Sequence, residues 1–251
     1  MAVRGRTFRC VWFRGVWAAV LLGGVVAPVP HASAAEAGGA DPCRALALGK
    51  TRYRPGPARH VVFAVADRYG DTEVTITECA RTARSGRSWR TVLTTRGHVG
   101  RNGFAAPGAK REGDGMSPSG SFSLTEAFGE GNPGTALPYR RLRDGGDCWG
   151  STVGDPRYNR YYRGTCLPDD ENLSQYMKDG PYKQAVVIDY NRPPQSPIVQ
   201  GHGSAIFLHI SAGRPTAGCV SLERPQVEAV MRTLRPHDRI MMGPREVLFR
   251  P

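Results

Sequence analysis

Short apolar runs separated by turn residues dominate the pattern of this chain. His60 to Ala66 is a largely apolar, β-branched run, and residues 71–79 alternate between apolar and polar side chains. Residues 68–71 between them have turn composition, so the two runs predict a β-hairpin. Further strands are expected at residues 88–95, 184–190, 205–210 and 239–242.

One segment has a clear helical period. Pro225 suits the first turn of a helix, and apolar residues at 227, 230, 231 and 234 recur at helical spacing. Residues 126–183 are polar and aromatic with little periodicity, which predicts a long functional loop. Several strands with one or two short helices predict a mainly β single domain, expected over residues 59–245.

The N-terminus reads as a secretory signal over residues 1–34. Four arginines precede an apolar run at residues 16–27, and Ala32-Ser33-Ala34 fits the small-x-small cleavage pattern. The run is shorter than the roughly 20 residues that span a bilayer, so no stable membrane insertion is expected after cleavage. An uncleaved membrane anchor is the alternative. Residues 35–58 are expected to form an extended lead-in.

Removing this leader changes the charge of the chain. The whole sequence has 34 basic and 22 acidic residues, a net charge of +12, and the leader contributes four arginines and no acid. The mature net charge of +8 suits a polyanionic surface such as a cell wall. A nucleic-acid partner is disfavoured, because the arginines are scattered and no basic helix or aromatic-interleaved stripe is present. The expected location is secreted, extracellular or wall-associated.

The cysteine count is odd once Cys10 leaves with the leader. Five cysteines remain: Cys43, Cys79, Cys148, Cys166 and Cys219. An exported protein can keep disulfides, and an odd number leaves at least one thiol unpaired. Pairing neighbours gives Cys43–Cys79 and Cys148–Cys166 with Cys219 free, although sequence leaves other connectivities open. Cysteine and histidine spacings do not match a zinc site, so no metal is expected.

The candidate chemistry lies at His209 and Cys219. His209 ends an apolar strand, and Cys219 follows ten residues later, after a Gly/Pro-containing loop that can fold back on the strand. An imidazole beside a thiol can take its proton and make it a nucleophile. Gly218 lets backbone amides approach closely, so the amides of Gly218 and Cys219 are candidate donors to an oxyanion. The alternative is an inert buried thiol near an ordinary strand-end histidine.

This segment resembles the catalytic signature of the L,D-transpeptidases, the YkuD-like family. Members have a histidine, a loop and then Ser/Thr-x-Gly-Cys, which His209 and residues 216–219 match. Residues 114–122 are similar to the family's Gly-x-Thr-Pro-x-Gly-x-Phe segment, and residues 187–191 to a strand of one branch. The resemblance covers residues 60–243 and implies a β-sandwich-like fold with a cysteine nucleophile and no cofactor.

The chain departs from the family pattern at three points. Ala217 stands where many members have histidine, and Ser221 stands where many have arginine. The spacing of ten residues from His209 to Cys219 is also shorter than in the better-known branch. These differences affect the expected cleft wall and carboxylate anchor more than the Cys/His chemistry.

The resemblance implies acyl transfer on peptidoglycan stem peptides. Cys219 would attack the carbonyl between the L-centre of a diamino acid and the terminal D-residue, releasing D-alanine and leaving a thioester. An amine of a neighbouring stem would resolve it into a cross-link, with His209 moving the protons. Carbapenem-type β-lactams are expected covalent inhibitors. The alternatives are an L,D-carboxypeptidase or endopeptidase, in which water resolves the thioester, and a non-catalytic wall-binding module.

Supporting roles are expected for several nearby residues. His209 needs its second ring nitrogen oriented, by Ser211 or by a backbone carbonyl. Arg214, between the two candidate catalytic residues, can bind a substrate carboxylate or remain solvated. Asp114 can cap a turn or bind substrate. The remaining candidate substrate contacts are Ser204, Tyr190, Thr216 and His202.

Overall fold

The computed structural model describes residues 41–82, 88–143 and 145–251. The predicted signal peptide over residues 1–34 lies outside the described residues. Within the described part of the chain, no helix is long and apolar enough to cross a membrane.

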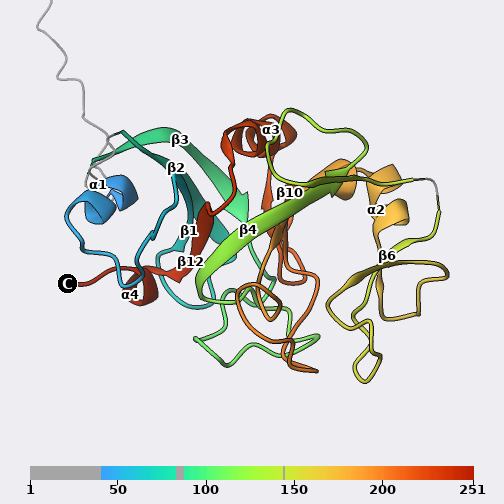
Figure 1. Cartoon of the computed structure of the whole chain (residues 1–251). Coiled ribbons are helices and arrows are strands. Elements are labelled where there is room, and N and C mark those ends of the chain that lie inside the picture. Colours follow the sequence, from blue (N-terminus) through green and yellow to red (C-terminus); the bar gives the residue numbers. More distant parts are fainter. Residues whose placement is uncertain (1–40, 83–87, 144) are drawn as a thin grey trace, which may run out of the picture. The chain divides into compact units, whose positions relative to one another are not determined.

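A nine-stranded sheet forms the body of the fold (Figure 1). In sheet order its strands are β12 (Arg239–Pro244), β1 (His60–Ala66), β2 (Glu73–Arg81), β3 (Trp89–His98), β11 (Val220–Leu222), β10 (Phe207–Ile210), β9 (Gln184–Ile188), β4 (Gly120–Gly129) and β5 (Tyr139–Arg141). β12 pairs with β1 on one side and β4 on the other, so the sheet closes on itself with β5 as an added edge. The predicted mainly β fold is confirmed, and so is the hairpin of β1 and β2.

The inner face of the closed sheet holds the main hydrophobic core. Val74 and Ile76, the apolar residues of the alternating run, lie there with Leu208 and Val220. Helix α3 (Arg224–Thr233) buries its apolar stripe in the same core, as its helical period predicts.

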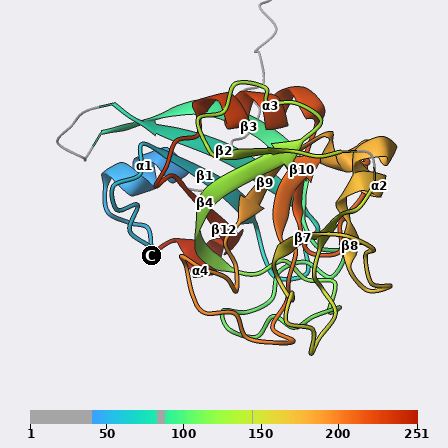
Figure 2. The ribbon, with the colours of Figure 1, turned by 45° about the vertical axis from the view of Figure 1, so that its right-hand side comes forward.

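The outer face carries two separate apolar clusters. Helices α1 (Pro42–Ala47) and α2 (Leu173–Asp179), which help to cover them, lie on opposite sides of the ribbon (Figure 2). The first cluster, called the α1 cluster, packs Val61, Phe63, Cys79 and Met241 beneath helices α1 and α4 (Arg245–Leu248).

The second cluster, called the α2 cluster, includes Phe128, Trp149, Tyr182, Phe207 and Cys219. Its cover is a three-stranded sheet of β6 (Asp147–Trp149), β7 (Tyr161–Arg163) and β8 (Glu171–Asn172), with helix α2 and the 3-10 helix η1 (Pro181–Lys183). Aromatic rings meet edge to face here, with the Trp149 and Phe207 centroids 5.1 Å apart.

The prediction of a long loop at residues 126–183 is wrong, because this segment forms the cover of the α2 cluster from regular elements. The segment contains the end of β4, strands β5 to β8, α2 and η1. Strands of two or three residues are too short to show a period in sequence. β4 is also absent from the expected strands, although it pairs with three other strands.

The expected extended lead-in is likewise not extended throughout, because residues 42–47 form helix α1. Asp41 caps the helix by accepting a hydrogen bond from the Cys43 amide, and Pro42 occupies its first position. Both expected disulfides form: Cys43–Cys79 ties α1 to β2, and Cys148–Cys166 ties β6 to the loop between β7 and β8. Cys219 is the free, buried cysteine of the described chain.

Candidate active site

Neighbouring parallel strands bring His209 and Cys219 to one face of the sheet. In the β10–β11 pair, Leu208 lies opposite Val220 and His209 opposite Ser221. Cys219 directly precedes β11 and extends it alongside Phe207, whose amide nitrogen lies 3.4 Å from the Cys219 Sγ. Because alternate residues of a strand point to opposite faces, the side chains of Cys219 and His209 both project from the outer face.

Hydrogen bonding fixes the tautomer of His209. Its Nδ1 lies 2.8 Å from the carbonyl oxygen of Ile210. A carbonyl can only accept, so Nδ1 carries the proton and Nε2 has the free lone pair of a base. The Ile210 carbonyl therefore orients the ring, rather than Ser211. The Ser211 Oγ instead accepts a hydrogen bond from the Gly213 amide.

Burial keeps both groups neutral. It lowers the pKa of His209 to about 4. It also raises the pKa of the Cys219 thiol to about 12, with the Glu171 charge adding to the rise. The Phe207 amide and Lys110 oppose this shift without reversing it. At neutral pH the resting pair is thus a protonated thiol and an uncharged imidazole, and the thiol needs a base to become a nucleophile.

Tyr182 and Glu171 complete the surroundings of this pair. The Tyr182 ring meets the His209 ring edge to face, with centroids 5.2 Å apart. The Tyr182 hydroxyl donates to the Glu171 Oε2 at 3.2 Å. Burial, with the nearby Glu112 charge, raises the pKa of Glu171 to about 7. Sequence reasoning missed Glu171, because a carboxylate in a two-residue strand has no periodic or motif signal.

A polar pocket of about 130 Å³ opens at Cys219. Basic Arg101 and Lys110 line it together with acidic Glu112, Asp169 and Glu171, and Ser151, Ser204, Ala205, Ile206, Gly113, Ala217 and Gly218 complete it. The pocket therefore offers both signs of charge to a ligand that reaches the thiol, and Ser204 is the predicted substrate contact that lies in it.

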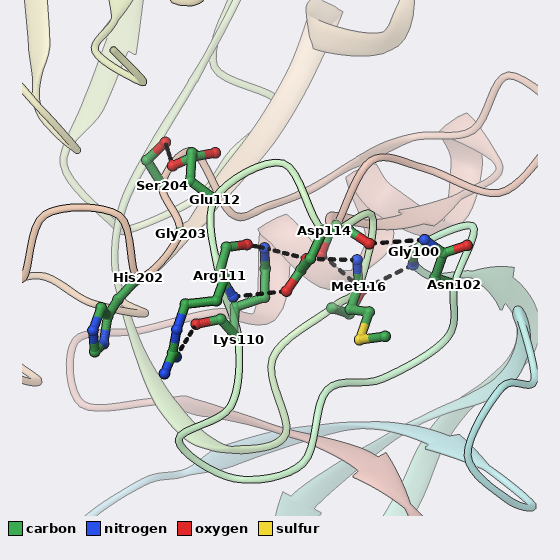
Figure 3. Close-up of polar contacts among 12 residues, drawn as sticks. Gly100, Asn102, Lys110, Arg111, Glu112, Asp114, Met116, His202, Gly203 and Ser204 are labelled. Carbon is green, nitrogen blue, oxygen red and sulfur yellow. Dashed lines mark hydrogen bonds and ion pairs between the residues drawn. The ribbon is translucent and has the colours of Figure 1, made fainter. Parts of the chain in front are cut away.

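The turn of residues 110–116 forms one wall of this pocket (Figure 3). Lys110 is buried, and its Nζ donates to Asp114 Oδ1 at 2.8 Å and to the Arg111 carbonyl at 2.6 Å. Asp114 also accepts from the Met116 amide at 2.8 Å. Of its two expected roles, Asp114 has the capping one in this structure.

The backbone around Gly218 is tightly held. The Gly218 amide donates to the Thr216 Oγ1 at 3.1 Å, and the Thr216 hydroxyl donates to the Cys219 carbonyl at 2.7 Å. A Cβ on Gly218 would lie 2.9 Å from the Met116 carbonyl oxygen, so only glycine fits there. Thr216 thus shapes the turn that presents Cys219. The Gly218 amide would have to leave Thr216 to bind an oxyanion.

Three other predicted contacts lie away from the thiol pocket. The Tyr190 hydroxyl donates to the His202 carbonyl at 2.8 Å, and the Tyr190 ring packs edge to face on Phe122. Neither Tyr190 nor His202 lines the pocket, and Arg214 is exposed in the loop before Cys219. Ser204, by contrast, lies in the thiol pocket, where its hydroxyl donates to Glu112 Oε2 at 2.7 Å (Figure 3). It also forms a hydrogen bond with the Ser151 hydroxyl at 2.9 Å.

Over the described ranges 41–82, 88–143 and 145–251, no group of three or more His, Cys, Asp or Glu side chains could hold a metal ion. A buried thiol that opens on a charged pocket, with an oriented neutral imidazole on the same face of the neighbouring strand, is an arrangement suited to covalent acyl transfer.

Comparison with protein families agrees with this class of site. The model of the L,D-transpeptidase catalytic domain, YkuD, matches residues 77–242. The match spans β2 to β12 and more than half of the chain, and the chain belongs to this family. A search of curated proteins returned no match.

Proposed function

We propose that this chain is an exported L,D-transpeptidase that cross-links peptidoglycan stem peptides through a thioester on Cys219. Membership of the family supports the reaction class. The disulfides are typical of an oxidising, extracytoplasmic environment, and the predicted leader supports export.

One observation carries the assignment of the catalytic pair. The Ile210 carbonyl holds His209 with Nδ1 protonated, and the strand register places its ring on the same face as the free Cys219 thiol. An imidazole oriented in this way can act as a base through Nε2.

In the acylation step, His209 Nε2 takes the thiol proton while Cys219 Sγ attacks the carbonyl carbon of the stem. The carbon–nitrogen bond to the terminal D-residue then breaks. The departing amine receives the proton from the imidazolium, leaving a neutral His209 and a thioester.

In the transfer step, an acceptor amine attacks the thioester carbon. A carbon–nitrogen bond forms, the carbon–sulfur bond breaks, and one amine proton passes through His209 to the sulfur. Water in place of the amine gives the L,D-carboxypeptidase or endopeptidase outcome with the same two side chains.

The charge distribution of the pocket supports a peptide substrate. Arg101 and Lys110 suit carboxylates of a stem peptide, and Glu171 suits an ammonium group. The mature net charge of +8 favours contact with an anionic wall.

Mass spectrometry of the intact protein tests the nucleophile. The protein lacking residues 1–34 is incubated with a carbapenem, and a covalent adduct is expected on the wild type and absent from Cys219→Ala. Ser119→Ala serves as a folded control that keeps the adduct. A wild-type protein that stays unmodified would support the non-catalytic wall-binding module instead.

Product analysis then separates transfer from hydrolysis. A stem tetrapeptide is supplied as donor, with and without a tripeptide acceptor. Cross-linked dimer supports the transpeptidase, whereas tripeptide alone assigns the hydrolase.

A further inference from the structure

A row of polar side chains crosses the outer face of the sheet from His209. His209 lies opposite Ser221 in the β10–β11 pair, and Ser221 lies opposite His98 in the β11–β3 pair. His98 in turn lies opposite Glu73 on β2. Because paired residues of neighbouring strands point to the same face, these four side chains form one continuous row.

Two polar atoms in the middle of this row are unpaired within the part of the chain that the structure describes. Ser221 is fully buried, and neither its Oγ nor the buried Nδ1 of His98 has a hydrogen-bond partner among the described residues. Such an unpaired buried group destabilises the fold, because it loses its hydrogen bonds to water without replacing them. Buried Ser119 shows the ordinary case, because its Oγ donates to the Ala105 carbonyl at 2.7 Å.

Three members of the row, Glu73, His98 and Ser221, line a second pocket of about 260 Å³, and His209 lies next to Ser221 outside its lining. Ser211, Arg96 and Glu223 also line this second pocket, and none of its residues lines the thiol pocket. β3 and β11 meet at a single residue pair. Gly97 allows this close approach, since a Cβ there would lie 2.6 Å from the Ser221 carbonyl oxygen.

The second pocket lies within reach of the nucleophile. Ser221 is two residues beyond Cys219 and points to the same face, which corresponds to roughly 7 Å along an extended strand. It is also the direct neighbour of His209. A group held here would thus approach the base from the side opposite to the thiol pocket.

We propose that this second pocket is the acceptor subsite, in which Ser221, His98 and Glu73 bind the primary amine that resolves the thioester. This inference rests on the proposed function. Glu73 and Glu223 attract the ammonium form at the rim. After the ammonium has lost one proton to water, Ser221 and His98 hydrogen-bond the neutral amine. Its nitrogen forms the new carbon–nitrogen bond, the carbon–sulfur bond breaks, and the second proton reaches sulfur through His209.

Ser221→Ala tests the subsite, because removing an unpaired hydroxyl should not destabilise the fold. We expect unchanged carbapenem acylation, an unchanged or higher Tm, and a fivefold or larger fall in dimer formation at fixed tripeptide concentration. The matched Ser119→Ala variant removes a paired buried hydroxyl. It should lower the Tm while leaving the ratio of dimer to tripeptide unchanged.

Glu73→Gln is a second test variant, at an exposed position. We expect it to raise the KM for the tripeptide and to leave the acylation rate unchanged. If Ser221→Ala and Glu73→Gln both use the tripeptide acceptor as well as the wild type does, the acceptor subsite is wrong and the proposed function still holds. If the wild type forms no adduct at all, the proposed function fails.

Calorimetric titration of the tripeptide into Cys219→Ala, with and without the additional change Ser221→Ala, then tests the subsite separately. Binding to Cys219→Ala that disappears when Ser221 is also replaced supports the subsite. Equal binding to both variants, or no binding to either, overturns it.

Discussion

The α1 and α2 clusters cover the same outer face of one sheet, yet they bury different groups. In the α1 cluster the buried cysteine on β2, Cys79, is joined to Cys43, and the surrounding side chains are apolar. In the α2 cluster Cys219 is free, and His209, Tyr182 and Glu171 lie beside it. Burial in the first cluster therefore stabilises the fold, whereas the second cluster holds neutral groups that can change protonation.

Two carboxylates show a related contrast in their partners. Buried Glu78, on β2, receives a hydrogen bond from Thr233 and pairs with His60 at 2.6 Å. Glu171 has a single hydrogen bond among the described residues, from the neutral Tyr182 hydroxyl, and its pKa rises to about 7 through burial. Glu78 therefore joins β2 to His60 and Thr233, whereas Glu171, with one neutral partner, lines a pocket in which a ligand can add further hydrogen bonds.

His209→Gln should produce the largest change in the α2 cluster. Glutamine keeps much of the side-chain volume but cannot accept the thiol proton, so the acylation rate should fall by about 10²–10⁴-fold. Stopped-flow measurement of carbapenem acylation checks this. A rate within threefold of the wild type would mean that another group removes the proton.

Removing the Cys43–Cys79 disulfide should instead affect stability. The bond closes a loop of sequence separation 36, so the double variant Cys43→Ala/Cys79→Ala should lose about 4 kcal/mol of unfolding free energy. Urea denaturation measures this loss. Carbapenem labelling of Cys219 should persist at 25 °C wherever the variant remains folded, and loss of labelling in a folded variant would contradict the separation of the two clusters.

Acidification should destabilise the α2 cluster through His209. Its folded pKa of about 4 lies below the ordinary 6.5, so its neutral form stabilises the fold above pH 6.5, and this contribution is lost as the pH falls through about 4. The loss is on the order of 3 kcal/mol. Denaturation curves of wild type and His209→Gln should converge toward pH 4, and parallel curves would argue against a neutral His209.

Arg214→Ala should have the smallest effect. Arg214 is exposed and lines neither pocket, so we expect a less than threefold change in kcat/KM for the tetrapeptide and no change in Tm. Steady-state kinetics checks this. A tenfold loss would show that the loop before Cys219 closes on the substrate and uses this guanidinium as a carboxylate anchor.

Much of the fold was predictable because its signals are local. The β1–β2 hairpin follows from alternation and turn residues, and α3 follows from its apolar stripe and Pro225. The cover of the α2 cluster was not predictable in the same way. Its strands have only two or three residues, and Trp149 of β6 packs on Phe207, which is distant in sequence.

The sequence by itself determined which residues are candidates for chemistry. The odd cysteine count, the His209-to-Cys219 spacing and the motif at residues 216–219 identify the candidate pair. Only the tertiary structure decided the environment of that pair. The Ile210 carbonyl fixes the tautomer, Glu171 and Lys110 meet in the thiol pocket, and strand register joins Ser221 and His98 to His209. These contacts join residues from separate strands and loops, and no local pattern encodes them because burial and register depend on the whole sheet.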